Sequence, residues 1–172
     1  MSYPSSKKYQ ADAGPGVRNV ASLLGTLGLS DREAVRRAFF DAFAFNVLVG
    51  GTDAHAKNYS LLLRGPRVAL APLYDAASYA PYLKPGEAAR SSMEVGRAWQ
   101  VRDVTVEDWA DVATALELAL DRVESLRTRL PEAVAEAAET APPSFTKDAH
   151  RVAAAVGRQR HLHVPRLPHA RR

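Results

Sequence analysis

Cysteine is missing from all 172 residues of the chain. Its absence excludes disulfide bonds, thiolate metal sites and cysteine nucleophiles, and it agrees with a reducing compartment. The sequence also contains no run that approaches the ~20 apolar residues of a membrane span, and residues 1–8 lack the apolar segment of a signal peptide. We therefore expect a cytoplasmic protein with no membrane attachment.

The remaining composition is that of an ordinary globular domain, with 47% apolar and 24% charged residues. The net charge of +4 is a property of the C-terminus, because residues 147–172 hold seven Lys or Arg and one Asp. A basic tail of this kind binds nucleic acid or an acidic protein face, but a solvated end is the simpler interpretation. We divide the chain into an N-terminal segment (1–29), a core (30–140) and a last helix with the tail (141–172).

The spacing of apolar residues predicts a mainly α-helical fold with a small β-hairpin. Ser30 and Glu33 form a capping-box pattern ahead of a long helix that should end at Gly50, and Thr105 with Asp108 begins a later helix in the same way. We expect helices over residues 30–49, 105–120, 122–139 and 145–158, a short helix that ends near residue 25 or 28, and an extended segment at 93–101.

The hairpin is predicted between residues 59 and 71, where two short apolar runs flank the turn sequence Gly65-Pro66. Ahead of it lies the loop Gly-Gly-Thr-Asp-Ala-His-Ala-Lys-Asn, residues 50–58. Because a hairpin folds the chain back on itself, it would return Asp75 to the side of this loop.

Asp53, Asn58 and Asp75 are then the polar groups that a protein kinase uses for phosphoryl transfer. In such enzymes a loop aspartate orients the accepting hydroxyl, while an asparagine five residues later and an aspartate beyond a hairpin hold Mg²⁺ on the phosphates. Mg²⁺ prefers oxygen ligands, so Asp and Asn suit it. Lys57, beside the asparagine, offers a positive charge to the transferring phosphate.

Several ordered stretches resemble the HipA-like serine/threonine kinases of bacterial toxin–antitoxin systems, over roughly residues 8–138. The matching stretches are KYQADAGPG at 8–16, DAHAKNYS at 53–60, PLYDAAS at 72–78 and MEVG at 93–96. The resemblance implies the C-terminal lobe of a protein-kinase-like fold. Ala13 and Arg97 stand where the family usually has a second glycine.

Carried over position by position, the resemblance implies Asp53 as the catalytic base and Lys57 as a contact to the γ-phosphate. It implies Asn58 and Asp75 as the Mg²⁺ ligands, so that ATP and Mg²⁺ are the cofactors. The implied activity is phosphorylation of a serine or threonine on a protein, and aminoacyl-tRNA synthetases are linked to the family as substrates. A DNA-binding antitoxin is the implied partner.

Family members are more than twice as long as this chain, and a nucleotide-covering N-lobe precedes the part that matches. We therefore expect a truncated C-terminal lobe that depends on an N-lobe supplied elsewhere, such as a separate chain. Two other functions stay open. A non-catalytic module would bind an antitoxin or nucleic acid through the basic tail. A metal-dependent hydrolase would use Asp53, His55 and Asp75, although the other four histidines lie at positions 150 to 169.

Overall fold

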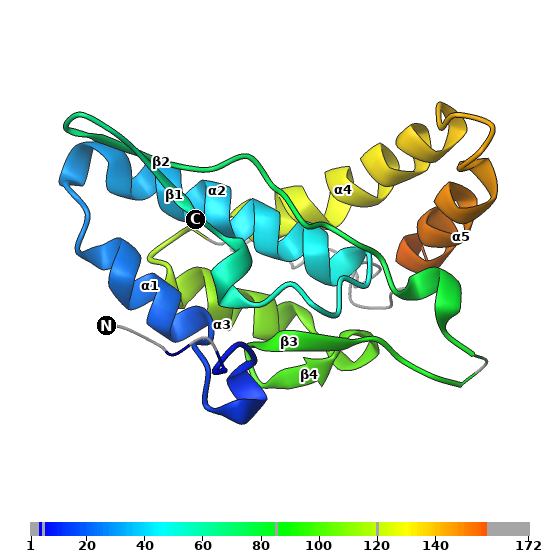
Figure 1. Ribbon diagram of the computed structural model, residues 1–172, viewed down its shortest axis with the longest axis horizontal. Coiled ribbons are helices and arrows are strands. Elements are labelled where there is room, and N and C mark those ends of the chain that lie inside the picture. The colour runs from blue at the N-terminus through cyan, green and yellow to red at the C-terminus, as the bar shows by residue number, and fades with distance from the viewer. Residues whose placement is uncertain (1–3, 5, 85, 120, 158–172) are drawn as a thin grey trace, which may run out of the picture.

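The computed structural model describes residues 4, 6–84, 86–119 and 121–157. Within them the chain forms helices and two antiparallel hairpins (Figure 1). The helices are α1 (Val17–Gly25), α2 (Leu29–Leu48), α3 (Val106–Ala115), α4 (Asp121–Glu139) and α5 (Thr146–Gly157). The hairpins pair β1 (Leu61–Arg64) with β2 (Arg67–Leu70), and β3 (Arg90–Val95) with β4 (Ala98–Gln100). The mainly helical fold and the first hairpin are confirmed. The second hairpin was not predicted from the sequence.

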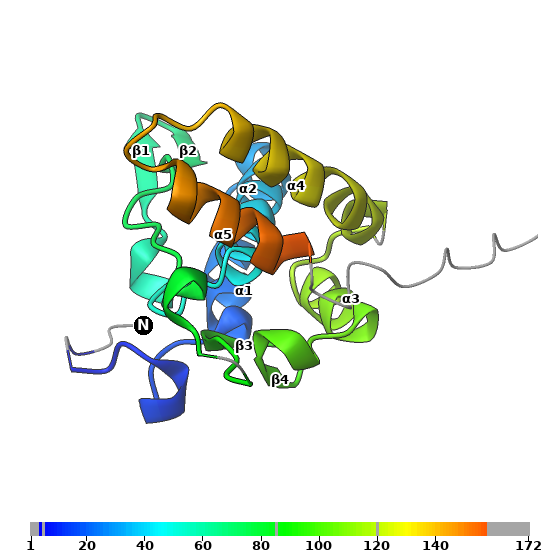
Figure 2. The ribbon, with the colours of Figure 1, turned by 90° about the vertical axis from the view of Figure 1, so that its right-hand side faces the viewer.

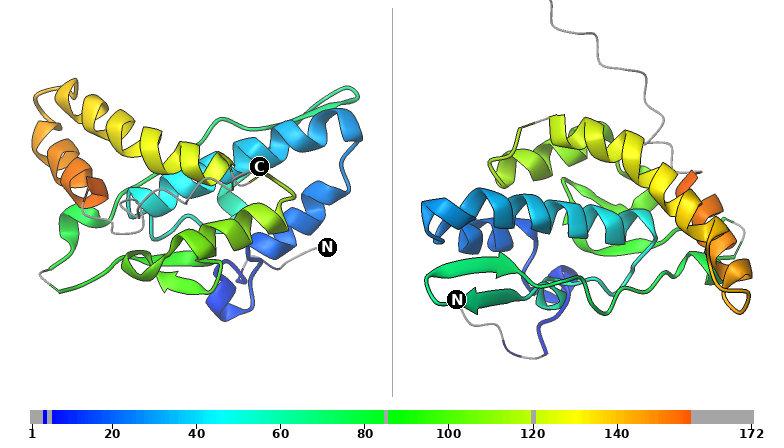
Figure 3. Two further views of the ribbon diagram at one scale, coloured as in Figure 1. Left: turned by 180° about the vertical axis from the view of Figure 1, so that it is seen from behind. Right: turned by 90° about the horizontal axis from the view of Figure 1, so that it is seen from above.

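The core forms around α2, which lies between the β1–β2 hairpin on one side and α3 with α4 on the other (Figure 3, right). Phe39, Phe40 and Phe43 of α2 are fully buried. Trp109 of α3 meets the rings of Phe40 and Phe43 edge-on, with centroids 5.9 Å apart in each case. Tyr59, just ahead of β1, meets Phe39 in the same way at 4.9 Å. Burying each large apolar side chain contributes about 1.5–3 kcal/mol. This packing holds α2 in place, and the loop at 50–58 follows directly on that helix.

The predicted capping box at the start of α2 is wrong. The helix begins at Leu29, one residue earlier, and Gly28 is its N-cap residue without a side-chain hydrogen bond. Ser30 therefore lies inside the helix, and Glu33 instead accepts both guanidinium hydrogen bonds of Arg37 one turn later. The second capping box is confirmed, because the Asp108 backbone N–H donates to the Thr105 hydroxyl and the Thr105 N–H donates to the Asp108 carboxylate.

Asp108 also holds the turn between β3 and β4. Its carboxylate accepts from the backbone N–H of Arg97 at 3.0 Å, and it is 6% exposed. Gly96, in the same turn, has a φ of 59° and packs directly on the backbone of Asp108. The single extended segment expected over residues 93–101 is thus two strands, because Gly96 reverses the chain. Trp99 lies half-buried, with the Arg90 guanidinium 4.7 Å from its ring centroid, and is not one of the core residues.

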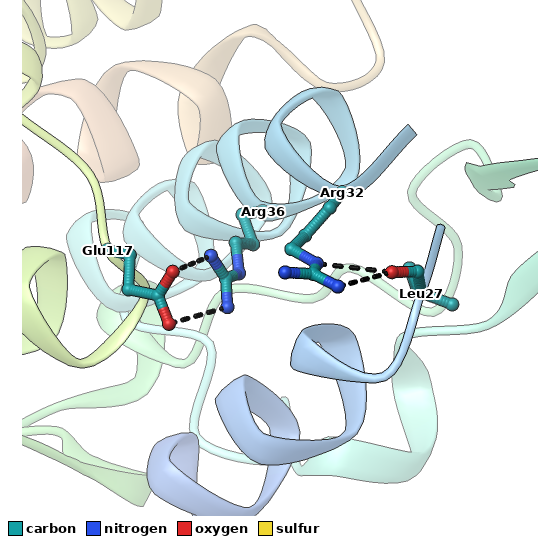
Figure 4. Close-up of polar contacts among 4 residues, drawn as sticks. All are labelled: Leu27, Arg32, Arg36 and Glu117. Atoms are coloured by element: carbon teal, nitrogen blue, oxygen red, sulfur yellow. Dashed lines mark hydrogen bonds and ion pairs between the residues drawn. The ribbon is translucent and has the colours of Figure 1, made fainter. Parts of the chain in front are cut away.

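Two arginines on one face of α2 tie that helix to its neighbours (Figure 4). Arg32 donates twice to the carbonyl oxygen of Leu27, which follows α1. Arg36, 5% exposed, donates to both carboxylate oxygens of Glu117 at 2.5 and 3.0 Å. Helix α3 ends at Ala115, earlier than predicted, and Glu117 follows with a φ of 54°. The ion pair therefore fixes the reversal between α3 and α4.

The β1–β2 hairpin is anchored to the first turn of α2 by Asp31. Its buried carboxylate accepts from the backbone N–H of Val68 at 2.8 Å and from the Arg67 guanidinium at 2.6 Å. These contacts, with the Val68 hydrogen bond foremost, hold the pKa of Asp31 below its ordinary value. The hairpin carries the chain from Asn58 to Asp75, so this contact indirectly positions both residues.

Acid should weaken the fold through these carboxylates. Burial opposes ionisation of Asp108, but its hydrogen bonds from Arg97 and Thr105 outweigh that effect, so its pKa is lowered as those of Asp31 and Glu117 are. A lowered folded pKa gives stability that is present above the unfolded values of about 4 and is lost as the pH falls through the folded pKa. We expect the urea midpoint to fall below about pH 4 and to fall less steeply in Asp31→Asn. Equal slopes in both proteins would contradict this linkage.

Ala13 has a φ of 60° and a ψ of 27°, in the left-handed region that residues with a Cβ rarely occupy. Relieving this strain in Ala13→Gly should raise the free energy of unfolding by about 1 kcal/mol, measured by urea denaturation. Ala11→Gly is the matched control, since Ala11 lies in the short 3₁₀ turn at Gln10–Asp12. There glycine adds only chain entropy and should be destabilising by about 0.5–1 kcal/mol. A loss of stability in both variants would show that Ala13 is unstrained.

Helices α4 and α5 pack together at one end of the molecule (Figures 1 and 2). Pro131 lies inside α4, which continues to Glu139 as one helix. The predicted last helix is α5, whereas the basic tail from residue 158 lies outside the described residues. The three-segment division of the chain stays a prediction. Within the described residues, no helix combines the length and the apolar content needed to cross a bilayer.

Candidate functional site

The loop at residues 50–58 leaves the C-terminal end of α2 through two glycines. Gly50 has a φ of 75° and accepts a hydrogen bond from the backbone N–H of Tyr79 at 2.9 Å. At Gly51 a Cβ atom would lie 3.0 Å from the carbonyl oxygen of Asn46, so the loop turns back tightly against α2. The backbone carbonyl of Asn46 accepts from Gly51 N–H at 2.7 Å, while the buried side chain of Asn46 donates to the Ala42 carbonyl and the Tyr59 hydroxyl.

Asn58 and Asp75, far apart in the sequence, meet at the far end of the loop. The amide nitrogen of Asn58 donates to Oδ2 of Asp75 at 2.7 Å. Asn58 is 5% exposed, and its Oδ1 is buried without a hydrogen-bond partner among the described residues. Asp75 has a φ of 55°, a conformation that Asp and Asn tolerate better than most residues. The predicted return of Asp75 by the hairpin is confirmed.

Asp53 is exposed at the middle of the loop and is in contact with the N-terminal segment. The hydroxyl of Tyr9 donates to its Oδ1 at 2.5 Å, and this hydrogen bond raises the pKa of Tyr9. The Tyr9 ring meets the buried His55 ring edge-on, with centroids 5.7 Å apart. Asp53 Oδ1 is therefore held in place by a residue 44 positions away, while its Oδ2 has no hydrogen-bond partner among the described residues.

Lys57 is also exposed and also reaches the N-terminal segment, where its ammonium group donates to the carbonyl oxygen of Pro4 at 2.7 Å. The structure thus places Asp53, Lys57, Asn58 and Asp75 on one loop and the segment that returns to it. Asp53 and Asp75 line a common cavity of about 220 Å³, together with Asn46 and Tyr79. This cavity therefore carries two carboxylates, and Asn58, whose Oδ1 is unpaired among the described residues, is bonded to one of them.

The donor set fits a hard cation that completes its coordination with phosphate or water oxygens. Asn58 supplies a buried oxygen with no donor, and Asp75 supplies a carboxylate beside it. In the part of the chain that the structure describes, no cluster of three or more His, Cys, Asp or Glu side chains could hold a metal by itself. His55 packs against the Tyr9 ring, and its Nδ1 is buried without a hydrogen-bond partner among the described residues. The hydrolase alternative stays a prediction.

Comparison with known proteins identifies the family. A family model described as the HipA-like C-terminal domain matches residues 1–143. The chain belongs to this family. The similar proteins include one from Sinorhizobium fredii (strain NBRC 101917 / NGR234) named "Putative kinase Y4mE", which is 30% identical over 139 residues. These residues make up 80% of this chain and 32% of that relative.

The HipA-like fold is also found among solved structures. A chain from the Shewanella oneidensis MR-1 toxin–antitoxin system, in a complex of HipA, HipB and operator DNA, matches with a TM-score of 0.72. The sequences are 21% identical, and the match covers 95% of this chain and 44% of that chain. The likeness confirms the kinase-like C-terminal fold. The HipA-like chain described here therefore spans about a third of the curated relative and under half of the solved one.

Tyr9 is the site residue that sequence reasoning missed in this HipA-like domain. It lies in the stretch at 8–16 that carries part of the family resemblance, but no local pattern assigns it a contact with Asp53. Gln10 is a second such residue. Its side-chain amide nitrogen donates to the Glu94 carboxylate of β3, and its Oε1 accepts from the backbone N–H of Glu94. Tyr9 and Gln10 fasten the N-terminal segment to the loop at residues 50–58 and to β3.

Proposed function

We propose that this HipA-like domain is the catalytic half of a protein kinase that transfers the γ-phosphate of ATP to a serine or threonine of a protein. The observation that carries the proposal is the contact between Asn58 and Asp75 beside a buried, unpaired Asn58 oxygen. Asp53 lines the same cavity as Asp75. A buried oxygen without a donor is costly unless a ligand satisfies it, and a cation would do so.

ATP would supply the phosphoryl group, and Mg²⁺ would neutralise charge on its phosphates. In this proposal Asn58 and Asp75 would hold the ion through their oxygens. Asp53 orients the acceptor hydroxyl with its free Oδ2 and takes the proton, because Tyr9 already occupies Oδ1. Lys57, which now donates to the Pro4 carbonyl, would supply a positive charge to the γ-phosphate.

The proposal includes partners that lie beyond this chain. The solved HipA is in a complex with HipB and operator DNA, and by analogy we propose a DNA-binding antitoxin as the partner here. An aminoacyl-tRNA synthetase is the proposed protein substrate, in the cytoplasm. The rest of the nucleotide pocket comes from an N-lobe outside these residues.

Calorimetry of ATP binding tests the proposal directly. We expect ATP at millimolar concentration to bind only when Mg²⁺ is present. Asp75→Asn should lower the affinity for Mg²⁺ and ATP at least about tenfold, because a charged Mg²⁺ ligand is lost. Asparagine tolerates the left-handed backbone at this position, so the loop should keep its shape. Asp111→Asn, on the exposed surface of α3, makes the same change of charge and should bind as the unmodified chain does. ATP binding that does not depend on Mg²⁺, or that Asp75→Asn leaves unchanged, would refute the proposed Mg²⁺ site.

A further inference from the structure

A second cavity, of about 450 Å³, lies beside the catalytic loop and has no role in the proposed binding of ATP. Its size falls within the ~300–1,000 Å³ of typical ligand pockets. It is lined by Tyr9 from the N-terminal segment, Thr52 and Tyr79 from the loop region, and Ser92 and Trp99 from the second hairpin. Thr52 and Tyr79 also line the smaller cavity that contains Asp53 and Asp75, so the two cavities are adjacent.

One of the residues that line the second cavity carries a polar group that lacks a partner among the described residues. Ser92 of β3 is 5% exposed, and its hydroxyl oxygen is buried with no hydrogen-bond partner among the described residues. An unsatisfied buried hydroxyl is destabilising, and native structures seldom keep one without a reason. A ligand that seats a carbonyl group against Ser92 would satisfy it.

The charge on the cavity walls restricts the ligand. Asp12 and Arg90 are the charged residues that line it, one of each sign, and Arg90 already lies over the Trp99 ring. The remaining lining residues are uncharged, so neither a phosphate group nor a run of acidic or basic side chains finds a complementary surface. Aromatic rings with a few polar groups suit an uncharged segment of polypeptide.

The sheet beside the cavity suits an extended segment. Within the described residues β3 pairs with β4 alone, so its other edge has no strand partner. At Glu94 the side chain of Gln10 takes that place, because the Glu94 backbone N–H donates to Gln10 Oε1 at 2.9 Å. Nearer the cavity, toward Arg90, none of the side chains that the structure describes takes that place on this edge. An open strand edge beside a pocket is a common way to bind an extended peptide.

We infer that this cavity receives the acceptor segment of the protein substrate, as an extended and uncharged stretch that lies along β3. Ser92 donates a hydrogen bond to a backbone carbonyl of the segment, and its serine or threonine reaches past Thr52 and Tyr79 toward Asp53. The inference rests on the proposed function in one respect: that the bound segment contains the serine or threonine that is phosphorylated. It adds the class of sequence that surrounds the phosphorylated residue.

Peptide binding to the full chain, without nucleotide, tests the inference. Three pools of short fluorescent peptides with a central serine carry flanking residues that are uncharged, acidic or basic, and anisotropy reports binding. We expect the uncharged pool to bind most tightly and Ser92→Ala to weaken that binding about three- to tenfold, as the loss of one hydrogen bond does. Ser30→Ala, on the exposed surface of α2, should leave the affinity unchanged.

Two further measurements distinguish a direct contact between Ser92 and the peptide from an effect of the substitution on the fold. Ser92→Ala should raise the urea midpoint of the free protein, because it removes an unsatisfied buried hydroxyl, while it weakens peptide binding. Replacing the central serine of the peptides by alanine should weaken binding to the unmodified chain but not to Asp53→Ala. Equal binding of all pools, preference for a charged pool, or unchanged affinity in Ser92→Ala would overturn the inference. Peptide binding without Mg²⁺-dependent ATP binding would instead refute the kinase proposal and leave a peptide-binding cavity.

Discussion

Gly96→Ala should lower the free energy of unfolding by about 3 kcal/mol, a large share of the stability of a small domain. Gly96 has a φ of 59°, where a residue with a Cβ is disfavoured by roughly 1–2 kcal/mol. A Cβ atom there would also lie 2.5 Å from Cα of Asp108 and 2.6 Å from its Oδ1. The backbone of Asp108 would have to move, which would break its bond to Arg97 and the cap of α3 at Thr105. Such a cap contributes about another 1 kcal/mol.

Gly65→Ala is the matched control for this prediction. Gly65, in the turn between β1 and β2, has a φ of 57° but nothing within 4 Å of the position that a Cβ would take. It should therefore show the backbone strain alone, about 1–2 kcal/mol. Urea denaturation of both variants separates strain from the overlap with Asp108. A loss in Gly96→Ala no greater than that in Gly65→Ala would show that the contact with Asp108 is unimportant.

Glu117→Gln is expected to lower the urea midpoint several times as far as Glu33→Gln does. Both glutamates pair with an arginine of α2, but the partners differ in burial. The Arg36 side chain is 7% exposed, whereas that of Arg37 is 48% exposed. Removing the carboxylate from Arg36 leaves a buried cation without its counter-charge, while Arg37 remains solvated. Glutamine keeps the shape of Glu117 and its backbone strain, so the comparison isolates the charge.

The order of effects within the pair is a sharper test. In Arg36→Met the apolar stem is kept and the charge is lost, and Glu117 can turn to solvent because its side chain is 69% exposed. This variant should therefore lose less stability than Glu117→Gln, although it breaks the same ion pair. Equal losses in the two variants would mean that the contact stabilises by attraction and that the buried charge of Arg36 is unimportant.

The sequence predicted those parts of the fold that local patterns determine. The turn at Gly65-Pro66 and the flanking apolar runs predicted the first hairpin, and the box at Thr105 predicted the start of α3. The end of α3 was missed because no glycine marks it. Glu117 takes the left-handed conformation there, and its partner Arg36 lies 81 residues earlier. A helix end that depends on a distant ion pair leaves no local signal.

The candidate site shows the same division. The spacing of Asp53, Asn58 and Asp75 and the intervening hairpin predicted that these residues gather, and the structure brings them together. The roles assigned to them stay predictions. The contact between Tyr9 and Asp53 spans 44 residues and joins two segments with no shared periodicity, so no sequence pattern could indicate it. Likewise, Ser30 failed as a cap because α2 begins one residue before it.

The bond from Lys57 to the Pro4 carbonyl has a practical consequence for protein engineering. Pro4 lies beside Lys57 of the loop at residues 50–58, so a polypeptide fused directly ahead of it would begin next to that side chain. An affinity tag at that end would compete for the space around Lys57 and would lower ligand binding at this loop for a reason unrelated to the loop itself. Tags for binding studies therefore belong at the opposite terminus. A linker ahead of Pro4 is the natural place to vary length when a second domain is joined.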